Sequence, residues 1–243
     1  MWRVGEVIAV RDETPTARTI SFRIGDWPGH LAGQHLDVRL TAPDGYSAVR
    51  TYSIASAASS EGGVEITVEC LEDGEVSPYL TRQVSAGDRL EVRGPLGGWF
   101  VWRPEQTEPI QLVAGGSGIV PLMAMIRSRR SPDGASPFRL LYSVREPGAT
   151  YYRGELDAAS GKDPALSNTY VYTRVAPQGW PRGPGRIDPA LIAGVTWPPS
   201  LRPTCYVSGP TSFVETAAGL LAAAGHSPGR IRTERFGPTG VSQ

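Results

Sequence analysis

A glycine-rich run in the middle of the chain places the strongest constraint on its fold. Residues 110–114 are apolar enough for a buried strand, and Gly115, Gly116 and Gly118 follow directly around Ser117. Three glycines within four positions let the backbone bend sharply and approach a ligand with no Cβ in the way. Pro121 fits the first turn of the helix that we expect next. A strand, a glycine turn and a helix N-terminus together predict a site for an anion such as a pyrophosphate.

The glycine run alone does not identify its ligand. The dinucleotide pattern Gly-x-Gly-x-x-Gly lacks its third glycine here, and no Lys-Ser or Lys-Thr pair follows as in nucleotide hydrolases. Ile119 stands where the elbow of a serine hydrolase needs glycine. A plain strand-to-helix turn therefore remains an alternative at this stage.

Composition excludes several classes of protein. The chain has 24 Lys and Arg against 24 Asp and Glu among its 243 residues, so we expect no nucleic-acid-binding face. No apolar run approaches the roughly 20 residues of a membrane span, and the first residues lack an apolar signal core. We therefore expect a cytoplasmic protein. Two cysteines and three scattered histidines predict no metal or iron–sulfur site, so any redox chemistry must come from an organic cofactor.

The first hundred residues have the pattern of β-strands. Six segments alternate apolar with polar residues or have strand composition: residues 7–10, 20–24, 36–40, 50–54, 64–70 and 89–93. An antiparallel sheet with one wet face produces this alternation, and closure into a barrel removes the sheet edges. We predict a six-stranded antiparallel β-barrel over residues 1–103.

Arg50, Thr51, Tyr52 and Ser53 are unusual for a barrel strand, because polar and aromatic residues follow one another without aliphatic neighbours. The run resembles the Arg-x-Tyr-Ser flavin motif of the ferredoxin–NADP reductase superfamily. The resemblance implies that Arg50 pairs with the FAD pyrophosphate, Tyr52 stacks on the isoalloxazine and Ser53 hydrogen-bonds near flavin N5. A guanidinium suits phosphate and a phenol offers a flat face, so the residue types fit these roles. An exposed strand with ordinary polar residues is the alternative.

A second stretch, from Gly74 to Pro78, resembles the Gly-x-x-Ser turn that opens a short helix in this superfamily. We predict Ser77 as the helix N-cap and Pro78 as the first helical residue. By the resemblance, the pyrophosphate is held by Gly74, Val76 and Ser77. The flavin pyrimidine is expected along the backbone of Thr67, Val68 and Glu69. A capped helical turn without a ligand explains the local sequence equally well.

From residue 109 onward, strands alternate with helices. We expect strands over residues 110–114, 139–144, 169–173, 204–208 and 231–236, and helices over 152–160, 187–193 and 211–224. Such alternation predicts a parallel sheet covered on both faces, with ligands at the carboxyl ends of its strands. The chain is thus predicted to be a β plus α/β protein. Residues 1–103 would form an FAD-binding barrel, and residues 109–243 an NAD(P)-binding α/β domain after a polar linker.

Two arginines follow strand ends in this second part. Ser143 and Arg145 follow one expected strand, and Thr173 and Arg174 follow the next. Both patterns resemble superfamily members that bind the adenosine 2′-phosphate of NADPH. Two guanidiniums suit a phosphate dianion, whereas a bare ribose calls for an acidic residue. The sequence therefore favours NADP over NAD, with a surface pair between Arg145 and Glu146 as the alternative.

Two further signatures concern the nicotinamide side. Ser208, Gly209 and Pro210 resemble the Cys-Gly-Pro signature, with Ser208 in place of the thiol that lies against the nicotinamide in the superfamily. We expect hydride transfer to survive this change, because the flavin carries the chemistry. Near the end, Glu234 and Phe236 resemble a Glu-x-Phe-Gly-Pro pattern that brings a carboxylate and an aromatic ring near the flavin, with Pro238 as its last residue. By the resemblance, Ser53, Ser208 and Glu234 are the catalytic candidates, and Phe236 contacts the cofactor.

The order of these signatures predicts a stand-alone reductase of the kind found in oxygenase electron-transfer chains. Hydride would pass from NADPH to FAD, and single electrons would then leave for a separate redox protein. Because the chain has neither the cysteines nor the length for a fused plant-type ferredoxin domain, we expect that partner to be another polypeptide: a ferredoxin, an oxygenase component, or a haem or molybdenum protein. Two alternatives stay open: a diaphorase or free-flavin or ferric reductase without a protein partner, and a non-catalytic dinucleotide sensor. The sequence does not predict an oligomeric state.

Overall fold

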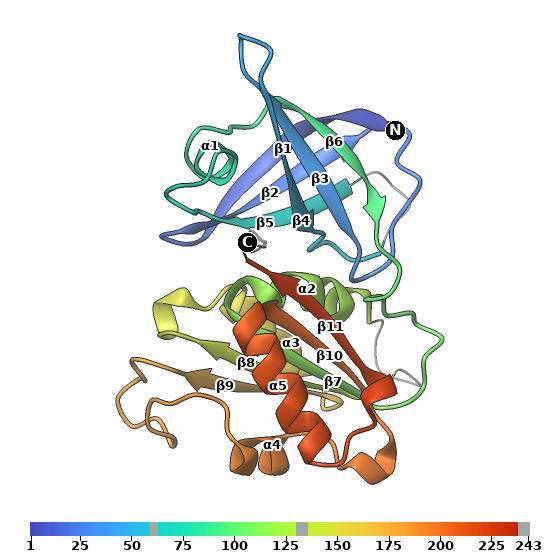
Figure 1. The fold of residues 1–243 in the computed structure, drawn as a ribbon, viewed down its shortest axis with the longest axis vertical. Helices are drawn as coiled ribbons and strands as arrows, with labels where there is room; N and C mark the ends of the chain where they lie inside the picture. Colours follow the sequence, from blue (N-terminus) through green and yellow to red (C-terminus); the bar gives the residue numbers. More distant parts are fainter. Residues whose placement is uncertain (59–62, 130–135, 238–243) are drawn as a thin grey trace, which may run out of the picture. The chain divides into compact units, whose positions relative to one another are not determined.

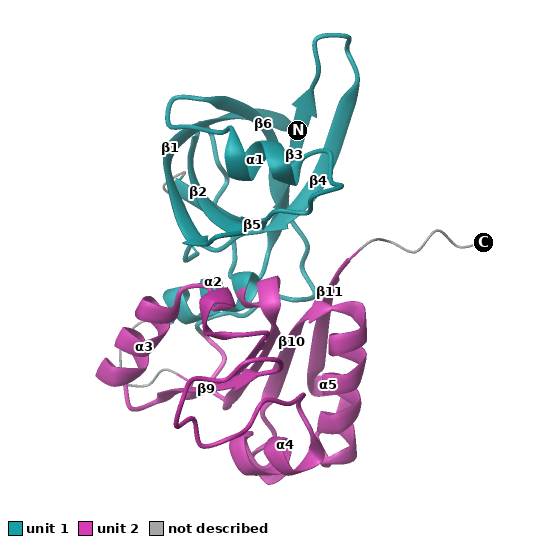
Figure 2. Cartoon of the chain, turned by 90° about the vertical axis from the view of Figure 1, so that its left-hand side faces the viewer, with its two compact units in different colours: residues 1–104, 120–130 teal, residues 105–119, 131–243 magenta. Residues whose placement is uncertain are grey.

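The structure, a computed structural model, describes residues 1–58, 63–129 and 136–237. Its contacts divide the chain into two compact units (Figure 2). Unit 1 comprises Met1–Pro104 with Val120–Arg130, and unit 2 comprises Glu105–Ile119 with Ser131–Gln243. The helix after the glycine run is thus grouped with the barrel. The division into cofactor domains at residues 103 and 109 stays a prediction.

Unit 1 contains the predicted six-stranded antiparallel sheet (Figure 1). Its strands are β1 (Trp2–Thr14), β2 (Ala17–Ile24), β3 (His35–Thr41), β4 (Ser47–Ser53), β5 (Gly63–Glu69) and β6 (Arg89–Leu96). They pair in the order β4-β3-β6-β1-β2-β5. A β-bridge between Ile54, which follows β4, and Ile66 of β5 joins the two ends of this order. The short helix α1 (Ser77–Arg82) lies between β5 and β6.

Alternation along the strands explains the barrel interior. Ile20, Phe22 and Ile24 of β2 are almost fully buried, while Arg23 between them is exposed. Burying one side chain of this size stabilises the fold by roughly 1.5–3 kcal/mol. Apolar residues from every strand and from α1 join the same cluster, so the barrel has a continuous core of its own.

Helix α2 (Ile119–Ser128) attaches to the barrel near the end of β4. The Arg127 guanidinium donates to the carbonyl of Ala55 at 3.0 Å and forms an ion pair with Glu65 at 2.8 Å. The Arg127 side chain is only 14% exposed, so this pair is shielded more than an ordinary surface ion pair. These bonds join α2 to unit 1.

Unit 2 contains a five-stranded parallel sheet in the order β11-β10-β7-β8-β9. Its strands are β7 (Ile110–Gly115), β8 (Phe138–Val144), β9 (Leu166–Tyr172), β10 (Thr204–Pro210) and β11 (Ile231–Phe236). The helices are α3 (Arg153–Lys162), α4 (Pro189–Val195) and α5 (Thr211–Ala223). These elements agree with the predicted alternation. Because the strands are parallel, all their carboxyl ends meet at one edge of the sheet.

Helices α4 and α5 cover one face of this sheet. Leu191 and Ile192 of α4 and Val214 and Leu221 of α5 are buried in one cluster with alternate residues of the strands, among them Val113. Figure 1 shows α5 running alongside β10 and β11. This packing fixes the start of α5 at the carboxyl edge, directly after Pro210.

Within the described ranges, no helix is both long and apolar enough to cross a membrane.

Candidate functional site: a flavin strand and a nucleotide edge

The predicted flavin motif lies at the end of β4. Tyr52 pairs in register with Leu36 and packs against the barrel core. Burial raises the pKa of the Tyr52 phenol, so the ring is neutral at any ordinary pH. Ser53 is 6% exposed, and its hydroxyl has no hydrogen-bond partner within the described residues. This strand end therefore carries a neutral, partly buried phenol, followed in sequence by a buried hydroxyl that has no partner within the described residues.

The first two residues of the motif are already engaged within the barrel. Arg50 is exposed and forms an ion pair with Glu75 at 2.6 Å. The Thr51 hydroxyl donates to Asp37 at 2.6 Å, and Arg93 binds the other oxygen of that buried carboxylate at 2.6 Å. Thr51 thus holds β4 to β3, whereas Arg50 keeps its charge at the surface.

The strand assigned to the flavin pyrimidine offers its backbone rather than its side chains. Thr67 is buried and shares a 2.7 Å hydrogen bond with Thr19, and Val68 belongs to the barrel core. Only the Glu69 side chain is exposed. Because β5 ends the strand order, the edge of Thr67–Glu69 that faces away from β2 is the edge at which a ligand can bind.

The turn before α1 corrects one sequence prediction. Val76, not Ser77, is the N-cap residue, and no side chain caps the helix. The Ser77 hydroxyl instead accepts from the Leu71 amide at 3.0 Å, which closes the turn internally. Val76 is fully buried in the core, so of Gly74, Val76 and Ser77 only backbone groups can contact a pyrophosphate.

The glycine run of unit 2 packs directly against the Ser-Gly-Pro segment. A Cβ on Gly118 would lie 2.1 Å from the Ser208 carbonyl oxygen, and a Cβ on Gly115 would lie 2.6 Å from the Phe213 ring. Gly209 has φ +154°, and a Cβ there would meet the Gly115 carbonyl oxygen at 2.9 Å. Only glycine permits this approach, so the glycine run before α2 and the end of β10 are in direct backbone contact.

Ser208 lies within this contact. It is fully buried, and its hydroxyl has no partner within the described residues. In register it faces Ala114 on β7 and Glu234 on β11. Phe236 stands beside Pro210 in the same pairing, while Pro238 lies outside the described residues. The structure thus brings Ser208, Glu234 and Phe236 to the carboxyl edge, as the sequence predicted for strand ends.

The two arginines after β8 and β9 are neighbours at the same edge. The Arg174 amide donates to the Arg145 carbonyl at 2.9 Å, and the Thr173 amide donates to the Val144 carbonyl at 2.8 Å. Both guanidiniums are exposed, and neither has an ion pair within the described part of the chain. The alternative of a surface pair between Arg145 and Glu146 is therefore not seen. Ser143 is buried in register with Gly115, and Pro121 is buried in the first turn of α2.

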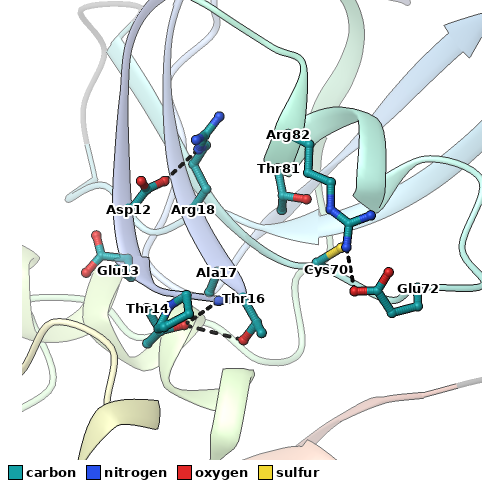
Figure 3. Close-up of a pocket in the computed structure, with 11 residues that line it drawn as sticks. Asp12, Glu13, Thr14, Thr16, Ala17, Arg18, Cys70, Glu72, Thr81 and Arg82 are labelled. Atoms are coloured by element: carbon teal, nitrogen blue, oxygen red, sulfur yellow. Dashed lines mark hydrogen bonds and ion pairs between the residues drawn. The ribbon is translucent and has the colours of Figure 1, made fainter.

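Sequence reasoning missed Glu75, which occupies a variable position of the Gly-x-x-Ser pattern yet binds the motif arginine. It also missed a cavity of about 470 Å³ beside α1 (Figure 3). The cavity is lined by the β1–β2 hairpin, Cys70, Glu72 and the end of α1. No predicted flavin residue lines it, and its charges are paired internally, as Asp12 with Arg18 and Glu72 with Arg82.

Comparisons with known proteins match both parts of the chain to oxidoreductase domains. The oxidoreductase FAD-binding domain family matches residues 7–101, and the oxidoreductase NAD-binding domain family matches residues 112–219. A flavohemoprotein of Bordetella pertussis is 29% identical over 255 residues, which cover 99% of this chain and 62% of the relative. The chain thus spans less than two thirds of that relative's length.

One further relative resembles the chain in sequence, and one solved structure resembles it in fold. The ferredoxin–NAD(P)+ reductase component of naphthalene 1,2-dioxygenase/salicylate 5-hydroxylase systems from a Ralstonia species is 28% identical over 98% of this chain and 70% of its own length. The flavohem-like FAD/NAD-binding domain of nitric oxide dioxygenase from Vibrio cholerae shares the fold, with a TM-score of 0.84 and 21% identity over 97% of this chain and 99% of that one. The chain therefore belongs to the ferredoxin–NADP reductase superfamily, with an FAD-binding and a pyridine-nucleotide-binding oxidoreductase domain.

Proposed function

We propose that this chain takes hydride from NADPH onto FAD and passes single electrons to a separate redox protein. FAD supplies the chemistry when bound, since it accepts two electrons as hydride and returns them one at a time. The protein supplies binding, orientation and exclusion of water.

The observation that carries this proposal is a pair of unused buried hydroxyls. Ser53 at the end of β4 and Ser208 at the end of β10 each lack a hydrogen-bond partner within the described residues. A buried hydroxyl left without a partner costs about 1–3 kcal/mol, and a bound ligand is one way to remove that cost. By the resemblance to the superfamily motifs, Ser53 would serve the flavin ring and Ser208 the nicotinamide, each as a donor or an acceptor.

The other residues fit holding roles. Tyr52 offers a neutral ring face for stacking, and Arg50 offers a charged fork for the FAD pyrophosphate. The turn from Gly115 to Gly118 offers backbone amides at the start of α2 for the nucleotide pyrophosphate. Hydride transfer needs close approach rather than a general base, so the neutral character of Ser208 is compatible with it.

The preference for NADP is supported by Arg145 and Arg174. Their backbones are adjacent, and their exposed guanidiniums, which form no ion pair with any residue that the structure describes, suit the 2′-phosphate dianion. An NAD-specific site at this position would place a carboxylate against the ribose hydroxyls.

The nature of the acceptor is inferred from relatives. The Ralstonia relative is named as a ferredoxin–NAD(P)+ reductase component of dioxygenase systems. We therefore propose a ferredoxin or an oxygenase component as the acceptor, ahead of a haem or molybdenum protein.

Anaerobic reduction followed by reoxidation tests the proposal. The FAD-loaded protein is mixed with NADPH or NADH without oxygen, and the visible flavin band is followed. Bleaching by NADPH, then rapid reoxidation by a one-electron protein acceptor, is expected. Reoxidation by free flavin or ferric complexes alone would favour a diaphorase. A band that does not bleach with either nucleotide would leave a dinucleotide sensor.

A further inference from the structure

The guanidinium that the flavin motif assigns to a phosphate is held by a carboxylate of the same chain. Arg50 Nη2 lies 2.6 Å from Glu75 Oε2, and Arg50 Nη1 donates to the Val49 carbonyl at 2.9 Å. One N–H group of each terminal nitrogen therefore has an acceptor within the chain, and the Glu75 carboxylate lies directly against the fork. A bidentate grip on a phosphate needs two parallel N–H groups of that fork.

Glu75 is fixed from a second side as well. Its Oε1 accepts from the Tyr46 hydroxyl at 2.7 Å, at the tip of the hairpin between β3 and β4. The hydrogen bonds from Tyr46 and Arg50 lower the pKa of Glu75, so the carboxylate is charged at neutral pH. Each oxygen of Glu75 thus serves one donor.

The backbone at Glu75 is constrained by its turn. The Gly74 amide donates to the Leu71 carbonyl at 2.8 Å, and the Leu71 amide donates to Ser77 Oγ at 3.0 Å. A Cβ on Gly74 would lie 2.9 Å from Ser77 Oγ, so the turn is closely packed. The approach of Glu75 to Arg50 is therefore set by the turn as well as by its own side chain.

We propose that Glu75 is an internal counter-anion that competes with the FAD diphosphate for Arg50 and thereby sets the affinity for FAD. This inference rests on the proposed role of Arg50 in flavin binding. Arg50 carries five N–H donors, of which Glu75 and the Val49 carbonyl take one each, so a phosphate must bind either beside the Glu75 carboxylate or in its place. Any carboxylate that remains near the diphosphate repels it, because like charges at close range disfavour each other even in water. Removing the charge of Glu75 while keeping its shape should tighten FAD binding.

A titration of the flavin-free full chain with FAD tests this. Binding is followed by the quenching of flavin fluorescence for the wild type, Glu75→Gln, Arg50→Ala and the double variant. We expect Glu75→Gln to lower the Kd for FAD about fivefold or more, and Arg50→Ala to raise it. In the Arg50→Ala background, Glu75→Gln should change the Kd for FAD much less, because the guanidinium for which Glu75 and the diphosphate compete is absent.

Glu72→Gln is the matched control. Glu72 forms a similar exposed pair with Arg82 on the same unit, beside the cavity in Figure 3, and should leave the Kd unchanged. Thermal unfolding of each flavin-free variant verifies that the fold is intact.

The possible results separate the inference from the proposed function. If Arg50→Ala weakens FAD binding but Glu75→Gln leaves it unchanged or weakens it, Glu75 does not compete for Arg50. The inference about Glu75 is then refuted, while the proposed role of Arg50 stands. If Arg50→Ala does not change the Kd, Arg50 does not bind the flavin. The proposed role of Arg50 then falls together with the inference.

Discussion

Replacement of Gly118 by alanine directly disrupts the contact between the glycine run and the end of β10, where we propose that the nucleotide binds. A Cβ at this position would lie 2.1 Å from the Ser208 carbonyl oxygen and 2.6 Å from the Gly209 amide nitrogen. Ordinary contacts begin at 3.4 Å, so the glycine turn and the end of β10 must separate by more than 1 Å. Both clashing atoms are backbone, and no side chain can move aside to relieve them.

The expected cost has two parts. Overpacking of this kind destabilises a fold by roughly 1–3 kcal/mol. A displacement of about 1 Å between groups that position a substrate can reduce turnover by about 100-fold. Because the clash lies within unit 2, FAD binding by the barrel should be retained. We therefore expect kcat/KM for NADPH to fall by about two orders of magnitude in a protein that still holds its flavin.

Steady-state reduction of an artificial one-electron acceptor measures this effect, with flavin absorbance and thermal unfolding recorded for each variant. Gly219→Ala on α5 is the control, since a Cβ there meets nothing within 4 Å. It should leave activity unchanged and raise stability slightly, because alanine favours helix over glycine. A Gly118→Ala variant with wild-type kcat/KM would refute the proposal that the contact between the glycine run and the end of β10 belongs to the nucleotide site.

Three further predictions concern the arginines, the missing thiol and the histidines. Arg174→Ala should raise KM for NADPH at least about tenfold and hardly change KM for NADH, because a charged phosphate hydrogen bond is lost; equal effects on both nucleotides would contradict the preference for NADP. Ser208→Cys restores the thiol of the superfamily pattern and should speed flavin reduction in stopped-flow experiments without a change in Kd for FAD; a slower step would contradict the role of Ser208 beside the nicotinamide. Burial lowers the pKa of His30, His35 and His226 below the usual 6.5, so the folded chain resists their protonation. The free energy of unfolding in urea should therefore be highest above pH 6.5 and should fall on acidification by up to about 1.4 kcal/mol per pH unit for each histidine, whereas a rise would contradict this linkage.

The sequence predicted the strand content because burial has a period of two in the barrel. Ile20, Phe22 and Ile24 alternate with polar residues, and the structure buries that face of β2. Strand lengths were less predictable. The structure extends β1 over Trp2–Thr14, while local alternation indicated only residues 7–10. The extension comes from pairing with both β2 and β6, which lie elsewhere in the chain.

The site could be predicted from the sequence where the backbone geometry requires one residue type, as it requires glycine at a close approach. The three glycines indicated that another group approaches the backbone closely at this turn. The structure shows that this group is the backbone of Ser208 and Gly209. The sequence could not show this, because β7 and β10 are neighbours in the sheet but distant in the chain. The prediction of Ser77 as an N-cap was wrong, since its hydroxyl binds the Leu71 amide instead. A Ser-Pro pair at a helix start does not reveal which amide the serine serves.

Glu75 could not be found from the motif, because the pattern leaves that position open. Its importance follows from the hairpin between β3 and β4, which brings Tyr46 to it, and from β4, which brings Arg50. Charge pairing across three separate segments depends on tertiary structure alone.

Single-turnover reduction of the FAD-loaded protein tests the central claim most directly. NADPH carrying deuterium at the transferred C4 position is mixed with the oxidised protein without oxygen, and flavin absorbance is followed in a stopped-flow instrument. Direct transfer between the two bound cofactors predicts full bleaching that is slower with deuterium than with hydrogen. A flavin that stays oxidised in the presence of excess reduced nucleotide would contradict the account.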